Sequence, residues 1–305
     1  MKTITIGKSG LSATRLAYGC WRLADVGEEK GRAAAAAAHE TGYTLFDHAD
    51  IYGDTECESI FGRVLKEVAG MREAIVIASK CGIRKPGTPN ADSPYRYDFS
   101  AEYIIESCEG SLRRLGVETI DIYQLHRPDY LCDPAEVAGA FEKLKSDGKV
   151  REFGVSNFNP SQVAMLQSAC PMPLIVNQVE ISLANLTCFD DGTLDQCLEK
   201  GITPLAWSPL GGGKLGDGPV QILGHQETYD TGKVVAELDA IANDRGVSRT
   251  VIALAWLLRH PSGISPIVGS TNPDRIREAA KADEVELTRD EWYRLMVAAR
   301  RRPLP

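Results

Sequence analysis

The sequence predicts an α/β fold in which eight parallel strands, each followed by a helix, close into a single barrel. Short apolar runs alternate with longer amphipathic or alanine-rich stretches from Leu16 to the C-terminus, a pattern typical of βα units and a parallel sheet. The composition, with 43% hydrophobic and 25% charged residues among 305, is that of an ordinary globular protein. It shifts nowhere sharply enough to mark a linker between domains.

The chain begins with a predicted hairpin. Lys2 to Ile6 and Ser12 to Ala17 alternate apolar and polar residues on either side of a glycine turn, as two short antiparallel strands do. Eight apolar runs are expected to form the barrel strands: Leu16 to Gly19, Thr44 to Asp47, Ile75 to Lys80, Ile120 to His126, Glu152 to Asn157, Leu174 to Glu180, Thr203 to Ser208 and Ile264 to Ser270.

Helices are predicted in the intervals between these runs. The seventh interval holds two, because Asp244-Arg245-Gly246 can end the first and Ser248 can cap the second. Thr288 to Arg300 adds a helix beyond the eighth unit. The interval helices are Gly31 to Thr41, Glu56 to Val68, Ala101 to Leu115, Pro134 to Asp147, Pro160 to Ala169, Thr193 to Lys200, Val234 to Leu258 and Pro273 to Asp283.

Eight such units close most economically into a (β/α)8, or TIM, barrel, since an open parallel sheet would leave two unpaired edges. We therefore predict one domain over residues 1–305. It is a TIM barrel with an N-terminal β-hairpin and extra helices after strand 7 and at the C-terminus. Two polar stretches, Arg84 to Phe99 and Gly211 to Gly232, follow the third and seventh strands and are expected to be loops over the barrel mouth.

Charge and cysteine content narrow the classes of function. The net charge of −8 argues against nucleic-acid binding, which needs a positive surface. The eight cysteines form no Cys-x-x-Cys pair, as expected of reduced thiols in a cytoplasmic protein. Met1 to Lys8 lacks the apolar stretch of a signal peptide. The longest apolar run, Val251 to Leu258, is far shorter than the roughly 20 residues that span a bilayer.

Polar residues end several of the predicted strands. In a barrel the carboxyl ends of all strands meet at one face, where the following loops surround an apolar floor. Asp47, Lys80 and His126 end the second, third and fourth strands, and Tyr52 follows the second. Lysine and histidine at the ends of apolar strands are costly unless they are paired. We expect these four residues to form a catalytic cluster.

The chemistry of the cluster follows from charge. A buried Lys80 ammonium needs a carboxylate, which Asp47 on the neighbouring strand can provide. Its positive charge favours a phenolate, so we expect Lys80 to lower the pKa of Tyr52 from about 10 toward working pH. A tuned phenol beside His126, which can orient a carbonyl oxygen, is a suitable general acid for carbonyl reduction.

The last βα unit has the features of a phosphate site. Ser270-Thr271-Asn272-Pro273 runs from a strand end into a helix, where Asn272 can cap the helix and Pro273 suits its first position. Exposed backbone amides and the helix dipole favour an anion there. Arg275 in the first turn can grip a 2′-phosphate, which favours NADPH over NADH.

These segments resemble the aldo/keto reductase family over nearly the whole chain. Phe46-Asp47-His48-Ala49-Asp50-Ile51-Tyr52-Gly53 is similar to the strand-two signature of that family. The other matching segments follow in the family's order: Ala78-Ser79-Lys80-Cys81-Gly82, Leu115-Gly116, Ile120 to Asp129, Gly154-Val155-Ser156-Asn157-Phe158, Asn177-Gln178, Trp207-Ser208-Pro209-Leu210 and Ile267-Val268-Gly269-Ser270.

The resemblance implies that Tyr52 donates the proton, that Asp47 and Lys80 tune it, and that His126 positions the substrate oxygen. It also implies a nicotinamide cofactor and no metal. In the family, Ser156, Asn157 and Gln178 would hold the nicotinamide amide, Trp207 would stack under the ring, and Glu278 would touch the adenine. Trp21 would form an aromatic wall of the substrate pocket. Gly269 stands where many members carry a lysine, which leaves NADH possible. The implied cofactor-binding residues are Ser156, Asn157, Gln178, Trp207, Ser208, Leu210, Gly269, Ser270, Thr271, Arg275 and Glu278.

Two other signals carry less weight. Gly211 to Gly216 fits Gly-x-Gly-x-x-Gly, but Asp217-Gly218-Pro219 cannot open the helix that a dinucleotide-binding motif requires. We expect a flexible loop that can fold over the pyrophosphate. His48 is a second candidate acid, but strand alternation turns it away from Asp47, so it ranks behind His126.

We predict an NAD(P)H-dependent oxidoreductase that reduces the aldehyde or ketone group of a small-molecule substrate. One alternative is a cofactor-binding sensor or regulatory subunit on the same fold with little turnover. Another is a metal-dependent barrel hydrolase that uses His126 and Asp129. The identity of the substrate depends on the conformations of the two mouth loops and the C-terminal tail, which the sequence does not determine. The sequence does not determine the oligomeric state either.

Overall fold

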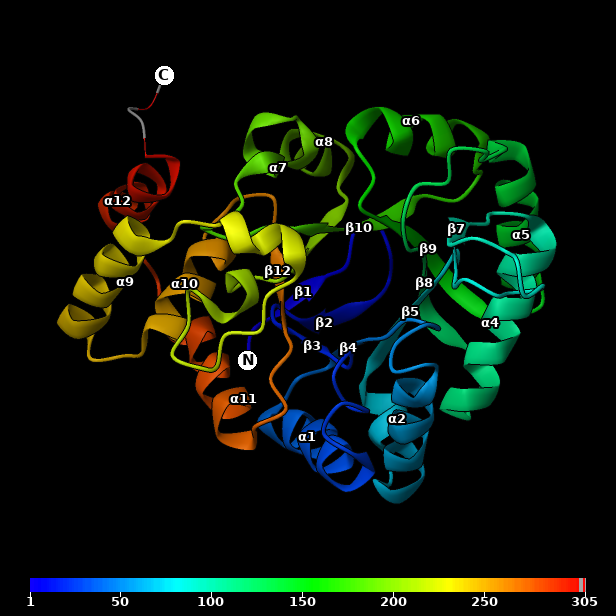
Figure 1. The fold of residues 1–305 in the computed structure, drawn as a ribbon, viewed down its shortest axis with the longest axis horizontal. Coiled ribbons are helices and arrows are strands. Elements are labelled where there is room, and N and C mark those ends of the chain that lie inside the picture. The colour runs from blue at the N-terminus through cyan, green and yellow to red at the C-terminus, as the bar shows by residue number, and fades with distance from the viewer. Residues whose placement is uncertain (302–303, 305) are drawn as a thin grey trace.

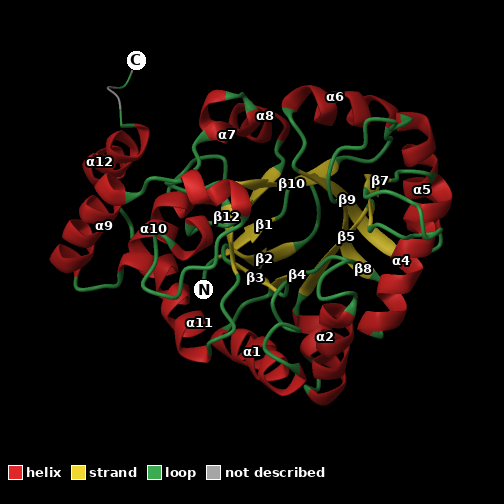
Figure 2. Cartoon of the chain, in the orientation of Figure 1, coloured by secondary structure: helices red, strands yellow, loops and turns green. Residues whose placement is uncertain are grey.

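Eight parallel strands close into a barrel in the computed structural model, which describes residues 1–301 and 304. Neighbouring strands follow the order β10-β11-β12-β3-β4-β5-β8-β9, and helices surround the ring of strands (Figure 1 and Figure 2). The predicted fold class is confirmed. The barrel strands are β3 (Ala17–Gly19), β4 (Leu45–Asp47), β5 (Val76–Cys81), β8 (Ile120–Leu125), β9 (Val150–Ser156), β10 (Leu174–Glu180), β11 (Thr203–Trp207) and β12 (Ser265–Val268).

The helices bury their apolar faces against the outside of this barrel, in one continuous core. Ser248 accepts a hydrogen bond from the amide of Val251 at the start of α10, and Gly246 ends α9 with a φ of 65°. Both confirm the predicted break between these helices. The helices are α1 (Glu28–Thr41), α2 (Glu56–Glu67), α3 (Met71–Ala74), α4 (Ala101–Leu115), α5 (Pro134–Ser146), α6 (Pro160–Ala169), α7 (Thr187–Asp190), α8 (Thr193–Lys200), α9 (Gly232–Arg245), α10 (Arg249–Leu258), α11 (Pro273–Ala280) and α12 (Arg289–Arg300).

The N-terminal hairpin closes the end of the barrel where the strands begin. Its strands, β1 (Thr3–Thr5) and β2 (Ser12–Thr14), pair antiparallel as predicted, and Figure 1 shows them within the ring of strands. Ile6 and Ala13 join an apolar cluster with residues at the starts of the barrel strands, such as Leu45 and Val76. The opposite end, where the strands finish, is left for the site.

The structure corrects several predicted boundaries. The stretch Arg84 to Phe99 is not wholly loop, because β6 (Ile83–Arg84) and β7 (Arg96–Tyr97) pair antiparallel within it. Gly211 to Gly232 contains two 3-10 turns, Gly211–Gly213 and Gly224–Thr228. The short helices α3 and α7 were not predicted, since four residues are too few to show a helical period. Other strand and helix ends differ by one to three residues.

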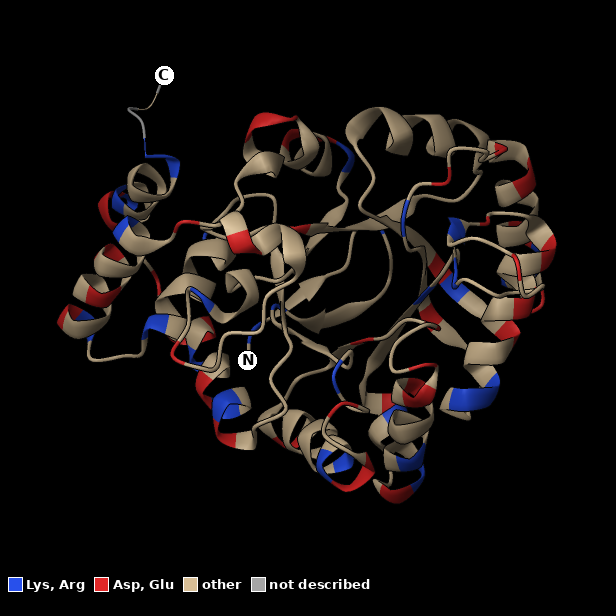
Figure 3. Cartoon of the chain, viewed as in Figure 1, with Lys and Arg blue, Asp and Glu red and all other residues tan. Residues whose placement is uncertain are grey.

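Charged residues lie mainly on the outer helices and loops (Figure 3). Of the helices that the structure describes, none combines the length and apolarity needed to cross a membrane. That the elements form one domain stays a prediction.

Candidate active site

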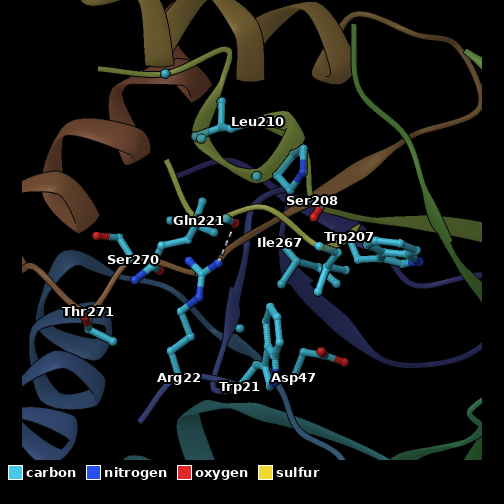
Figure 4. A pocket seen from close by; sticks show the side chains of 18 of the residues that line it. Trp21, Arg22, Asp47, Trp207, Ser208, Leu210, Gln221, Ile267, Ser270 and Thr271 are labelled. Carbon is cyan, nitrogen blue, oxygen red and sulfur yellow. Dashed lines mark hydrogen bonds between the residues drawn. The ribbon is translucent and has the colours of Figure 1, made fainter. Parts of the chain in front are cut away.

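A cavity of about 570 Å³ opens at the carboxyl ends of the barrel strands. Every residue predicted for the site lines it, with the exception of Lys80. Lys80 is fully buried and lies behind Tyr52 and Asp47, so it acts on the cavity through them. Figure 4 shows side chains from several strand ends, among them Trp21, Asp47, Trp207 and Ser270, around this space.

Lys80 uses all three of its N–H donors inside the protein. Its Nζ lies 2.8 Å from Asp47 Oδ1 and donates to the carbonyl oxygen of His48 at 2.6 Å. The third bond goes to the Tyr52 hydroxyl oxygen at 3.2 Å. Burial lowers the pKa of Lys80, but Asp47 and Tyr52 outweigh burial, so the pKa is raised overall and the cation persists. The predicted cluster is therefore assembled as a charged network.

The predicted direction of the Tyr52 pKa was wrong. Burial raises the pKa of the phenol above its ordinary value, and the opposing effect of Lys80 does not overcome burial. Removal from water destabilises the phenolate of Tyr52. The Lys80 cation stabilises it by a smaller amount, because the charge of Lys80 is itself neutralised by Asp47. Tyr52 is accordingly protonated at neutral pH and holds a proton that it can donate.

A tight turn places Tyr52 beside Lys80. Gly53, Asp54 and Thr55 all have positive φ angles, of 56°, 53° and 79°. A Cβ at Gly53 would lie 2.5 Å from the Cβ of Ala24, so only glycine fits there. The turn reverses the chain between β4 and α2 and directs the phenol into the cavity wall.

The two histidines of the region differ as predicted. His126 lines the cavity, and its ring lies 5.8 Å from that of Tyr52 in an edge-on arrangement. Burial, then the charges of Lys80 and Arg127, hold the pKa of His126 well below its ordinary value, so the imidazole is neutral. His48 instead packs against Phe61 of α2, 4.5 Å between ring centres, and lies outside the cavity lining.

Gln178 has a contact that the sequence did not predict. Its Nε2 donates to Asp47 Oδ1 at 2.7 Å, across a separation of 131 residues. The Asp47 carboxylate is thereby held between Lys80 and an amide. Only closure of the barrel brings β10 opposite β4, so no local signal could have revealed this bond.

Ser156, Asn157 and Trp207 form one hydrogen-bonded group on the next part of the wall. Asn157 donates to the carbonyl oxygen of His126 at 3.0 Å and accepts from Trp207 Nε1 at 3.0 Å. Asn157 has a φ of 63° and Ser208, after β11, has a φ of 47°. Such left-handed residues cost energy and often occur at functional sites. The network fixes the indole of Trp207 at the cavity edge.

The predicted phosphate-binding site, Ser270 to Arg275, lies at the start of α11. Asn272 caps the helix by accepting from the amides of Asp274 and Arg275, so these two amides are not exposed as we expected. The helix dipole and the Arg275 side chain remain to attract an anion. Ser270, Thr271 and Arg275 line the cavity here. Glu278 lines it as well and pairs with Lys281 at 2.6 Å.

The segment Gly211 to Gly232 folds over the cavity as predicted, and it is anchored at several points. Lys214 Nζ donates to the carbonyl oxygens of Gln226, Glu227 and Tyr229 at 2.7, 3.1 and 2.9 Å. Arg22 reaches across to the carbonyl oxygen of Gln221 at 3.5 Å, as Figure 4 shows. The sequence analysis did not predict Arg22 and Gln221 as cavity residues, although both line the cavity. Arg22 could have been found because it directly follows Trp21, whereas Gln221 lies in an irregular loop with no sequence motif.

The pair needed for the hydrolase alternative is not formed. Asp129 Oδ2 accepts from the amide of Phe99 at 3.0 Å, and Oδ1 accepts from the amide of Leu131 at 2.9 Å. Both oxygens shape the loop after β8. Across residues 1–301 and 304, no cluster of three or more metal-ligating side chains is found.

Comparison with known proteins finds relatives over nearly the whole chain. The model of the aldo/keto reductase family matches residues 15–299. The chain is 42% identical to a 6-dehydroglucose reductase of Novosphingobium aromaticivorans, over 98% of this chain and 96% of that protein. It is 41% identical to the oxidoreductase YdhF of Escherichia coli, over 98% of both chains.

A solved structure is similar over the same span. The crystal structure of the thermostable aldo-keto reductase Tm1743 with the inhibitor epalrestat superposes with a TM-score of 0.83 at 26% identity. It covers 98% of this chain and all of the other. With a closed eight-stranded parallel barrel and a family match over nearly its full length, the chain belongs to the aldo/keto reductase family.

Proposed function

We propose that the protein reduces an aldehyde or ketone with a nicotinamide cofactor and that Tyr52 is the proton donor. One observation carries the proposal. The Tyr52 hydroxyl oxygen already accepts a hydrogen bond from Lys80 Nζ, which leaves the hydroxyl proton free to point toward the cavity. The raised pKa of Tyr52 keeps that proton on the phenol at neutral pH, as a general acid requires.

The other residues of the cluster support the transfer. His126, neutral because its pKa is lowered, can donate an N–H to a carbonyl oxygen placed between its ring and that of Tyr52. As the phenol loses its proton, the Lys80 cation 3.2 Å away stabilises the developing negative charge. Asp47 holds the ammonium in place, and Gln178 in turn donates to the Asp47 carboxylate. When bound, the cofactor supplies the hydride that the carbonyl carbon needs.

The residues of the cavity fit a nicotinamide dinucleotide. Aldo/keto reductases use such cofactors. The side chain of Arg275 makes no hydrogen bond or ion pair with another described residue, so its guanidinium is available for a 2′-phosphate, which supports NADPH over NADH. Ser156, Asn157 and Gln178 are assigned to the nicotinamide amide and Trp207 to the ring face. Ser208, Leu210, Gly269, Ser270, Thr271 and Glu278 complete the contact surface.

Tyr52→Phe tests the proposal. It removes the proton and leaves the ring, so carbonyl-dependent NADPH consumption should fall by about 100-fold or more, within the range attributed to general acids. Quenching of tryptophan fluorescence by NADPH should be retained. Tyr103→Phe is the matched control, because Tyr103 is not part of the cavity lining and its hydroxyl donates to the backbone carbonyl oxygen of Ile83.

Two results would contradict the assignment. Equal turnover by Tyr52→Phe and the wild type would remove Tyr52 from the mechanism. Tight NADPH binding by the wild type, without consumption in the presence of any of a broad panel of aldehydes and ketones, would instead support the sensor or regulatory subunit.

A further inference from the structure

Arg127 is a cation in the cavity lining that pairs with no carboxylate in the part of the chain that the structure describes. It follows β8 directly after His126, is half-buried and lines the cavity with Trp21 and Tyr95. Among the described residues it has neither a hydrogen bond nor an ion pair. A guanidinium that is partly removed from water without a partner is costly, so its position calls for an explanation.

Three carboxylates of this region, those of Asp129, Asp98 and Asp47, bind groups other than Arg127. Asp129, two residues later, accepts backbone amides with both of its oxygens. Asp98 pairs with Arg84 at 2.6 Å. Asp47, which also lines the cavity, is held between Lys80 and Gln178. None of these acidic groups neutralises Arg127, and the substrate end therefore carries an uncompensated positive charge.

The charge of Arg127 affects the pKa values of three residues that line the cavity. It contributes to lowering the pKa of His126, and it opposes the rise in the pKa of Tyr52 that burial causes. It also opposes the rise in the pKa of Tyr95, another residue of the cavity lining. Arg127, Tyr52 and His126 line the same cavity, so one small molecule bound there can contact all three side chains.

We propose that Arg127 recognises an oxyanion on the substrate, so that the preferred substrates are aldehydes or ketones that also carry a carboxylate or phosphate group. A guanidinium fork binds the two oxygens of such a group with paired N–H donors, which adds geometric selectivity to charge. Trp21 and Tyr95 supply apolar walls for the carbon skeleton. This inference rests on the proposed carbonyl reduction and specifies its substrate class.

The test compares substrate pairs matched in size and different in charge. One pair is 4-carboxybenzaldehyde and 4-formylbenzamide, and the other is glyceraldehyde 3-phosphate and glyceraldehyde. The two pairs distinguish a carboxylate from a phosphate. The variants are Arg127→Gln, which removes the charge, and Arg127→Lys, which keeps the charge without the fork. Arg277→Gln is the control, since Arg277 is an exposed arginine of α11 that pairs with Asp274 outside the cavity lining.

We expect the wild type to prefer the anionic member of at least one pair by about 10- to 100-fold in kcat/KM, the range expected for hydrogen bonds between charged groups. Arg127→Gln should abolish this preference, chiefly by raising KM for the anionic member, and should lower kcat/KM less for the uncharged member than for the anionic one. Arg127→Lys should retain part of the preference, and Arg277→Gln should retain all of it.

Absence of preference in both pairs would overturn the proposal. An equal loss for charged and uncharged members in Arg127→Gln would do so too, because Arg127 would then serve as a wall or a donor to substrate hydroxyl groups. Calorimetric titration of the cofactor-loaded protein with 4-(hydroxymethyl)benzoate and 4-(hydroxymethyl)benzamide needs no turnover. If no carbonyl is reduced, the proposed function fails, and the titrations alone decide whether Arg127 selects the anion.

Discussion

His48→Leu should make the protein less sensitive to acid. The imidazole is fully buried, and neither of its nitrogens has a hydrogen-bond partner among the described residues. Burial, then the charge of Lys80, lowers the pKa of His48 from 6.5 to about 3 in the folded protein. Between these values the unfolded chain binds a proton that the folded chain does not, so the free energy of unfolding falls as the pH falls.

The size of the effect follows from the two pKa values. Each pH unit below 6.5 removes about 1.36 kcal/mol, so about 2 kcal/mol is lost by pH 5 and almost none at pH 7.5. Urea unfolding, followed by tryptophan fluorescence at both pH values, gives the measurement. The wild type should lose about 2 kcal/mol more than His48→Leu between these conditions, because leucine does not titrate and other groups cancel in the comparison.

Phe61→Leu is the control for packing. Phe61 contacts His48, and its truncation should lower stability by a similar amount at both pH values. An identical pH dependence in the wild type and His48→Leu would refute the reasoning, since it would mean that His48 is protonated or hydrated in the folded state.

Three further predictions concern stability and the loop over the cavity. Lys80→Met should cost about 3–5 kcal/mol in urea unfolding because it leaves Asp47 buried without its cation, and Asp47→Asn combined with Lys80→Met should recover much of this; an equal loss in both variants would contradict the pairing. Gly154→Ala should lower the Tm, because its Cβ would lie 2.8 Å from the carbonyl oxygen of Val176, whereas Gly139→Ala on the open face of α5 should stabilise by about 0.5–1 kcal/mol; the opposite order would refute the contact. Lys214→Gln removes the donor to three carbonyl groups and should accelerate chymotrypsin cleavage after Tyr229; an unchanged rate would show that Lys214 does not anchor the loop.

The strand pattern predicted where most of the candidate residues lie in the fold, at the carboxyl ends of the barrel strands. Asp47, His126 and Ser156 end or directly follow strands, and parallel closure brings all strand ends to one face whatever the details of packing. The alternation of side chains along a strand also predicted that His48 points away from the cavity, and in the structure His48 packs against Phe61. These features depend on local periodicity, which short stretches of sequence carry directly.

The direction of the Tyr52 pKa needed the tertiary structure. The sequence shows that a lysine and a phenol can meet, but the extent of their removal from water depends on residues from many strands. In the folded protein burial outweighs the cation, and Tyr52 keeps its proton. The availability of that proton toward the cavity follows from the three bonds made by Lys80.

By itself the sequence determined the barrel, its order of elements and the residue types at its mouth, because hydrophobic period and turn chemistry act between residues close together in the chain. Only the tertiary structure decided that Gln178 holds Asp47, that Lys80 lies behind the cavity wall and that Arg127 has no partner among the described residues. Those outcomes depend on distances and dehydration between segments far apart in the chain, which come into existence only when the barrel closes.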